Sequence, residues 1–272
     1  KNDIAKANSV GDITKSQYTH WTEFVTHFNN QTYQRQHLKS VVRKYIHKIL
    51  DDDELDFESD PTIIHSQVMP HNHATKSNIS PQDAIKIPEV SSKFVNNLMS
   101  LRDSSSDLLK VIEANILQLP VHIRIVCREV YVLARAMFPD HLDQQHLAVA
   151  GICFWKYYFG VIILFPENYG LNSKTYLRGP ANLRHLHRLM LQLFTMKPFT
   201  NNFLKPLNDY LLSHVDTIQT IVRGIIDIGD IDEVYKFGDF NDMVAEAPKL
   251  TMKTNSMIYL EKLALTNAEV MA

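Results

Sequence analysis

The chain contains 272 residues, of which 45% are hydrophobic and 21% are charged. This composition is typical of a globular protein and excludes a mostly disordered chain. Only 8 residues are glycine, and no Asn-Gly, Asp-Gly or Gly-Gly pair occurs, so tight hairpins and a sheet-rich fold are disfavoured. The formal net charge of −2 argues against a general nucleic-acid-binding protein, which is usually basic. We therefore expect a soluble, mainly helical protein.

The N-terminal part of the chain has helical apolar spacing from Tyr18 to Leu50, interrupted by a polar stretch at Asn29–Thr32 that predicts a loop. An acidic segment, Asp51–Pro61, follows. It lacks the glycine at the sixth position and the spaced closing glutamate of an EF-hand, so it predicts a solvated connection rather than a calcium loop. A new helix is expected to start at Ser80-Pro81, because serine is a favoured N-cap and proline suits the first helical position.

Three further stripes of apolar residues predict helices ending before Pro120, before Pro139 and near Phe194, and the apolar stretch Leu147–Phe165 predicts a helix buried in the centre of a domain. Helices are also expected over Phe203–Ile226. No apolar run reaches the ~18 residues that span a bilayer, so no membrane span is expected. We expect an elongated all-α domain over residues 1–238, lacking its extreme N-terminal part, and a helical appendage over residues 239–272.

Motifs that carry chemistry are scarce. The sequence contains no phosphate-binding glycine-rich loop, no H-E-x-x-H and no G-x-S-x-G. His65, His71 and His73 lie close together, but no cysteine or carboxylate completes a ligand set at the usual spacing, so no metal site or cofactor is expected. Cys127 and Cys153 are too few for a disulfide framework and predict buried, reduced thiols in a cytosolic protein.

Basic residues form the clearest polar pattern. Arg184 and Arg188 are four residues apart, so on a helix they project together, away from the apolar stripe that resumes at Leu183. Arg124 and Arg128 have the same spacing. Lys156 lies within the most apolar stretch. These residues are either ordinary solvated side chains, with one snorkelling lysine, or a cationic groove for an acidic partner.

Several separate segments resemble one family. They are LPVHIRIVCREVYVLARAMFP, VAGICFWKYYFGVIILFPENYGL, LKSVVRKYIHKILDDDELDFESDPTIIH, SPQDAIKIPEV and ANLRHLHRLMLQLFTMKPF. Together they resemble the GAP-related domain of IQGAP proteins, in the superfamily of Ras GTPase-activating domains, and the chain looks like a fungal member. The resemblance implies an all-helical domain that binds a small GTPase of the Rho or Ras type.

The resemblance also identifies what catalysis would require. An active domain inserts an arginine finger that neutralises charge on the transferring phosphoryl group. The finger loop corresponds to Asn29–Gln34, and the finger falls at Thr32 or Tyr33, neither of which is cationic. The arginine that steadies this loop is matched by Lys156, which keeps the charge but loses the bidentate fork, and the Asn-Pro that follows in the family is replaced by Phe159-Gly160.

A catalytically inactive, GTPase-binding module is therefore implied, with Arg188 where the family has a groove lysine. The implied GTPase-binding residues are Asn30, Gln31, Thr32, Tyr33, Arg35, Lys156, Arg184 and Arg188. The family also implies a cytoplasmic scaffold at the cytoskeleton and contractile ring, with other cytoskeletal partners bound outside this chain. Two alternatives stay open: an active Ras-type GTPase activator that uses Arg35 after a two-residue slip, and a structural self-association domain.

Overall fold

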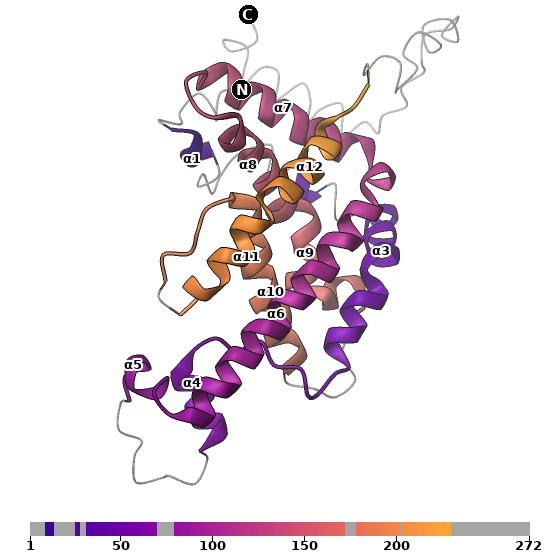
Figure 1. The fold of residues 1–272 in the computed structure, drawn as a ribbon. Coiled ribbons are helices and arrows are strands. Elements are labelled where there is room, and N and C mark those ends of the chain that lie inside the picture. Colours follow the sequence, from indigo (N-terminus) through magenta and orange to yellow (C-terminus); the bar gives the residue numbers. More distant parts are fainter. Residues whose placement is uncertain are drawn as a thin grey trace, which may run out of the picture. The chain divides into compact units, whose positions relative to one another are not determined.

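The computed structural model describes residues 9–13, 25–27, 31–69, 79–171, 178–201 and 203–229. Every regular element in these ranges is helical, which confirms the all-α fold class (Figure 1). In chain order the elements are α1 (Val10–Ile13), α3 (Thr32–Leu50), α4 (Pro61–Val68), α5 (Pro81–Ala84), α6 (Pro88–Ala114), η3 (Ile116–Gln118), α7 (Val121–Met137), α8 (Asp143–Phe154), η4 (Trp155–Phe159), α9 (Gly160–Leu164), η5 (Pro166–Tyr169), α10 (Arg178–Thr195), η6 (Lys205–Leu207), α11 (Asn208–Ser213) and α12 (Val215–Ile226).

Local capping sets where several helices begin. The backbone N–H of Asp83 donates to Ser80 Oγ at 3.2 Å, and Pro81 occupies the first turn of α5, as the sequence predicts. At α4 the backbone N–H of Thr62 donates to the Asp60 carboxylate at 2.8 Å. These side chains satisfy N–H groups that have no partner within the helix.

The apolar centre of the chain is a continuous helical stretch from α8 through η4 to α9. Its pattern predicts one uniform α-helix, but Trp155–Phe159 forms a π-helical turn in the middle. Phe154, Trp155, Tyr158 and Phe159 are completely buried there. Because a π turn adds a residue to the helical repeat, it rotates the side chains that follow it relative to those before it.

The sequence was expected to contain no apolar run of bilayer length, yet by length and composition Asp143–Leu164 is one helix that is long and apolar enough to cross a membrane. However, 78% of its most apolar window is buried inside the fold. That burial is what the core helix of a globular domain has, because neighbouring helices already cover its apolar surface.

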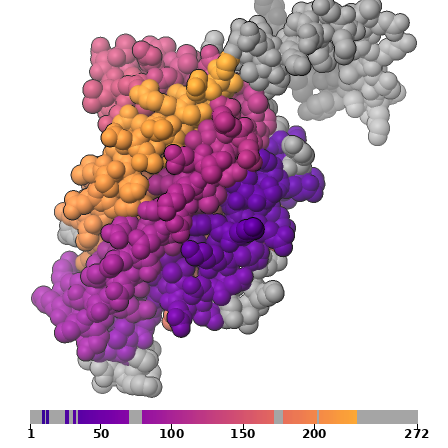
Figure 2. All heavy atoms as spheres, turned by 45° about the vertical axis from the view of Figure 1, so that its right-hand side comes forward, coloured from indigo at the N-terminus to yellow at the C-terminus, as the bar shows by residue number. Residues whose placement is uncertain are grey.

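Around the centre, α10 packs against α3, α8 and α9, and α12 packs against α7 and α8 (Figure 1). The approach of α10 to α3 is close: a β-carbon at Gly179 would lie 2.9 Å from the Cα of Leu50. Figure 2 shows the long helix α6 running across one face, between α11 and α12 on one side and α3 on the other.

Two further expectations meet different outcomes. The acidic connection after α3 is not wholly solvated, because Phe57 is fully buried and Asp56 is buried against Lys93, with Nζ 2.9 Å from the carboxylate. A buried carboxylate needs such a partner. Cys127 and Cys153 are buried and free, as predicted.

The chain divides into two units, Lys1–Ile228 and Gly229–Ala272. The predicted boundary between residues 238 and 239, and the helical appendage after it, lie outside the described residues. His71 and His73 also lie outside them.

Candidate functional site

The exposed arginines of α10 stand opposite a buried stripe. Leu183, Leu186 and Met190 are buried, whereas Arg184 and Arg188 are exposed, which confirms the direction that the sequence predicts for them. Residues four apart in a helix share a face. The two guanidinium groups therefore project from one exposed face of α10.

The orientation of α10 is fixed by a buried amide. Asn182 is only 2% exposed. Its Nδ2 donates to the carbonyl oxygen of Leu55 at 2.8 Å, and its Oδ1 accepts from the backbone N–H of Phe57 at 2.9 Å. Both hydrogen bonds join α10 to the connection after α3, so rotation of the helix would leave buried polar groups unpaired.

Two histidines flank this arginine face on opposite sides of α10. His185 Nε2 lies 3.6 Å from the Glu58 carboxylate. Burial raises the pKa of Glu58, but the hydrogen bonds from His185 and from backbone N–H groups outweigh it and leave that pKa below its ordinary value. His187 packs against Trp155, with ring centroids 5.5 Å apart, and burial lowers the pKa of His187 to about 4.

Lys156 is exposed, although both segments around it are buried. It lies in the π turn, directly after the fully buried Trp155, and its Nζ lies 5.2 Å from the centroid of the Tyr157 ring. A cation over an aromatic face is attracted by the ring quadrupole. The turn therefore presents one positive charge beside α10, which contacts η4.

The start of α3 carries the residues implied for the finger loop. Gln31 is the N-cap and Thr32 the first helical residue, and both are exposed. Asn30 and the side chain of Tyr33 lie outside the described residues. The Arg35 guanidinium carbon lies 5.9 Å from the centroid of the buried Tyr169 ring. Arg35 is thus half-buried and directed towards η5.

Some residues of this region were not singled out from the sequence. Lys39 follows Arg35 by four residues and its Nζ donates to the carbonyl oxygen of Gly170 at 3.5 Å, while Arg43, four residues further, is exposed. The helical spacing of these three cations could have identified Lys39 and Arg43. Nothing in the sequence places Tyr169 beside Arg35, because that contact depends on how η5 packs against α3.

Arg124 and Arg128 do not belong to an exposed basic face. Arg124 donates to the carbonyl oxygens of Ile225 at 3.1 Å, Gly224 at 3.1 Å and Asp227 at 2.6 Å. Arg128 donates to the carbonyl oxygen of Ile228 at 3.1 Å. The last carbonyls of a helix have no partner within it and carry partial negative charge. Both arginines therefore cap the C-terminus of α12.

The fold thus places Arg35, Lys156, Arg184 and Arg188 on neighbouring elements. Helix α10, with Arg184 and Arg188, packs against α3, which carries Arg35, and against η4, which carries Lys156. Within the ranges that the structure describes, no three His, Cys, Asp or Glu side chains are placed to hold a metal ion. The chemistry of the arrangement is electrostatic: Lys156, Arg184 and Arg188 are exposed cations, and the half-buried Arg35 lies over the Tyr169 ring.

Comparison with known proteins identifies relatives of the chain. Residues 1–195 match the family described as GTPase-activator protein for Ras-like GTPase. The chain is 48% identical to the Ras GTPase-activating-like protein IQG1 of Candida albicans over 99% of its length, which is 18% of that protein. It is 22% identical to rng2 of Schizosaccharomyces pombe over 95% of its length, 18% of that protein, and 20% identical to human IQGAP3 over 86% of its length, 15% of that protein. The resemblance to the GAP-related domain of IQGAP proteins is confirmed.

Proposed function

The chain belongs to the family of GTPase-activator proteins for Ras-like GTPases, and from this premise we propose that it binds a small GTPase of the Rho or Ras type without accelerating GTP hydrolysis. Binding would use Lys156 of η4, Arg184 and Arg188 of α10, and residues at the start of α3. The exposed arginine pair on α10 carries the proposal. Within the described part of the chain, neither arginine side chain is assigned to a salt bridge or a hydrogen bond of the fold, so the pair can supply positive charge to a partner.

Electrostatics supports the binding half of the proposal. Arg184 and Arg188 are exposed and share one face. In contrast, Arg124 and Arg128 donate hydrogen bonds to carbonyl oxygens at the C-terminal end of α12. A GTPase with bound triphosphate presents negative charge around its nucleotide. Cations that face such a surface raise the association rate and favour the correct partner.

The absence of catalysis is supported at the start of α3. An arginine finger must reach into the nucleotide site of the partner, and it contributes ~10³–10⁵ in rate. Thr32 and Tyr33, at the matching positions, carry no positive charge. Arg35 lies over the Tyr169 ring and is directed towards its own fold. The proposed module therefore binds but does not complete the active site.

We extend the proposal to the setting of the domain. The chain spans 18% of the Candida IQG1 protein, so most of that relative lies outside the region that the chain matches. By its resemblance to IQGAP proteins, we propose that the parent is a cytoplasmic scaffold of the cytoskeleton, acting at the contractile ring of dividing cells. Other cytoskeletal proteins would bind elsewhere on the parent.

Binding is tested with a panel of purified Rho- and Ras-type GTPases, each loaded with GDP or with a non-hydrolysable GTP analogue. The double variant R184E/R188E should weaken binding by one to two orders of magnitude, about 1.4–2.8 kcal/mol, while the fold stays intact, because exposed substitutions usually change stability by less than ~0.5 kcal/mol each. Wild-type affinity should also fall with added salt.

The matched control is K197E/K205E. Lys197 and Lys205 are exposed and lie outside the proposed site, and reversing them changes net charge by the same amount. This control should bind nearly as wild type at 0.15 M salt. Equal loss in both double variants would mean that only overall charge matters, and unchanged binding by R184E/R188E would place the partner elsewhere. Absence of binding to every GTPase would overturn the proposal.

A further inference from the structure

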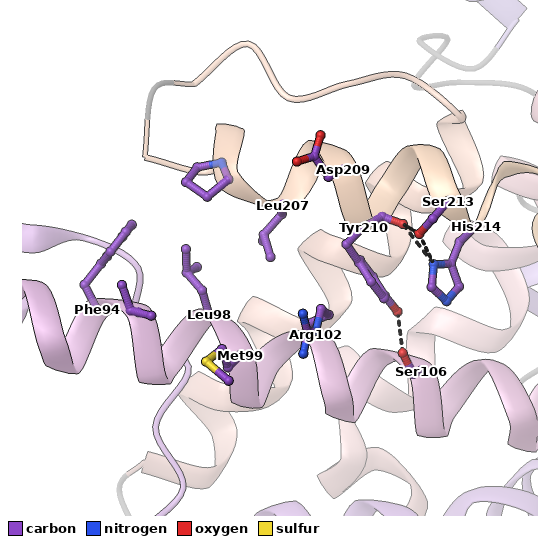
Figure 3. Close-up of a pocket in the computed structure, with 12 residues that line it drawn as sticks. Phe94, Leu98, Met99, Arg102, Ser106, Leu207, Asp209, Tyr210, Ser213 and His214 are labelled. Carbon is purple, nitrogen blue, oxygen red and sulfur yellow. Dashed lines mark hydrogen bonds between the residues drawn. The ribbon is translucent and has the colours of Figure 1, made fainter.

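A second surface, which shares no lining residue with the arginine face, lies between α6 and the η6–α11 segment. It is a groove of about 660 Å³ (Figure 3). Its floor is apolar: Phe94 and Leu98 are each 6% exposed and Leu207 is 4% exposed. On the α6 side, Val95 and Met99 line the groove while remaining 49% and 48% exposed. Large apolar side chains gathered in an exposed groove are typical of an interaction site.

At one end of the groove, a cluster of hydrogen-bonded polar side chains joins α11 to α6. The Tyr210 hydroxyl lies 2.7 Å from Ser105 Oγ and 2.9 Å from Ser106 Oγ, which ties α11 to α6. The His214 ring packs on Tyr210 with centroids 4.2 Å apart. Because these groups already have partners, they fix the separation of the two helices. The groove is therefore a preformed feature of the fold.

The two rims of the groove carry opposite charges. Figure 3 shows Arg102 rising from α6 and Asp209 from α11, on opposite sides of the groove, and both are exposed. Arg102 Nε donates to Asp103 at 3.3 Å. That pair is exposed and such pairs contribute little, so it leaves Arg102 available to a partner. An occupant is favoured when it places negative charge beside Arg102 and positive charge beside Asp209.

The geometry favours a helical occupant. Val95, Met99 and Arg102 have the i, i+4, i+7 spacing by which one helix packs along another. The stretch of α6 from Phe94 to Ser106 is about 18 Å long at the ~1.5 Å rise of each residue, or about three turns. Both walls are helical, so they offer no strand edge to pair with an extended peptide. A helix satisfies its own backbone groups and needs none.

We propose that the α6–α11 groove binds an amphipathic helix of a partner protein, whose apolar stripe covers Val95 and Met99, whose acidic flank lies beside Arg102, and whose basic flank lies beside Asp209. This binding is separate from the proposed GTPase site, since none of the groove residues named here belongs to it. The opposite rim charges also fix the direction in which the helix lies, because reversing the helix exchanges its flanks.

The test uses two synthetic helical peptides of identical composition and identical apolar stripe. In the first, all glutamates lie on one flank and all lysines on the other; in the second, the charges are mixed on both flanks. Fluorescence anisotropy with the full chain should give the first peptide roughly two- to fivefold tighter binding, because each exposed charge pair contributes only modestly. M99E should weaken binding of the first peptide at least roughly tenfold relative to the wild-type chain, because it places a charge in the apolar part of the groove. R102E, which makes both rims acidic, should erase its advantage over the second.

The control variant is L117E, because Leu117 is 85% exposed and does not line the groove. It should bind the first peptide as wild type does. The proposal is overturned if neither peptide binds at 1 mM, if both bind equally, or if L117E weakens binding as much as M99E. Because no GTPase is present in the assay, its outcome is independent of the proposed GTPase binding.

Discussion

A β-carbon placed on Gly160 would lie 2.5 Å from the carbonyl oxygen of Trp155 and 2.8 Å from Cε2 of its indole ring. The backbone N–H of Gly160 donates to that same carbonyl and closes the π turn. Glycine is therefore required at this position for the close approach, not for an unusual backbone angle. Trp155 is fully buried and packs on His187 of α10. Lys156, which is exposed, therefore lies in a π turn that the contact between Trp155 and Gly160 closes.

We predict that G160A destabilises the protein by about 1–3 kcal/mol, the usual range for overpacking. Relief is difficult because the nearest obstacle is a backbone oxygen rather than a flexible side chain. Chemical denaturation monitored by circular dichroism measures the effect. G224A is the control, since a β-carbon at Gly224 would meet only the side chain of Ile116, at 3.3 Å. Equal effects of the two variants would contradict the packing argument.

The pairs Arg124/Arg128 and Arg184/Arg188 have the same spacing in the sequence, but we expect them to have different functions. We predict that R124A lowers stability by about 2–3 kcal/mol, because a charged donor is lost and three carbonyl oxygens at the end of α12 lose their partner. R184A should change stability by less than ~0.5 kcal/mol and weaken GTPase binding instead. Urea denaturation and binding measurements on the same two variants check the pair. A stable R124A protein would mean that these hydrogen bonds contribute little.

Much of the fold follows from the sequence because it depends on local signals. The helix start at Ser80-Pro81 and the inward stripe of α10 need only the residues near them, and both are confirmed. The π turn was not predicted. It lies where Trp155 packs on His187 and Phe194 of α10, which are distant in the sequence. A hydrophobic run has the same pattern with or without the extra residue of a π turn.

In the candidate site, too, local features could be predicted from the sequence, whereas contacts between distant segments could not. Helical spacing predicts that Arg184 and Arg188 share an exposed face, and it predicts the same for Arg124 and Arg128. Only the first pair is exposed as expected. The second pair lies beside the end of α12, about a hundred residues away in the chain, and spacing contains no information on that contact. The roles proposed for Lys156, Arg184 and Arg188 stay predictions until binding is measured.

Acid should destabilise the protein through His187. Burial lowers its folded-state pKa from 6.5 to about 4, so between these values the unfolded state binds more protons than the folded state. Its contribution is therefore fully present above pH 6.5 and decreases as the pH falls towards 4, by at most about 3 kcal/mol. We predict that H187Q shows a shallower loss of stability between pH 6.5 and 4.5 in denaturant titrations. Parallel profiles for H187Q and wild type would contradict this burial effect.

Arg35 provides the sharpest test of catalysis, because it is the arginine nearest to the implied finger positions. Its guanidinium lies over the Tyr169 ring, and withdrawing it would forfeit a cation–π contact of about 0.5–2 kcal/mol and expose part of a buried aromatic ring. We predict that a GTPase saturated with the chain hydrolyses GTP in single turnover within a few-fold of its intrinsic rate, and that R35A leaves this rate unchanged. R43A is the matched control, since Arg43 is an exposed arginine on the same helix. Acceleration approaching the ~10³–10⁵ of an arginine finger, lost in R35A and retained in R43A, would instead establish an active GTPase activator. It would also require the start of α3 to rearrange when the partner binds, because the present contact directs Arg35 into its own fold.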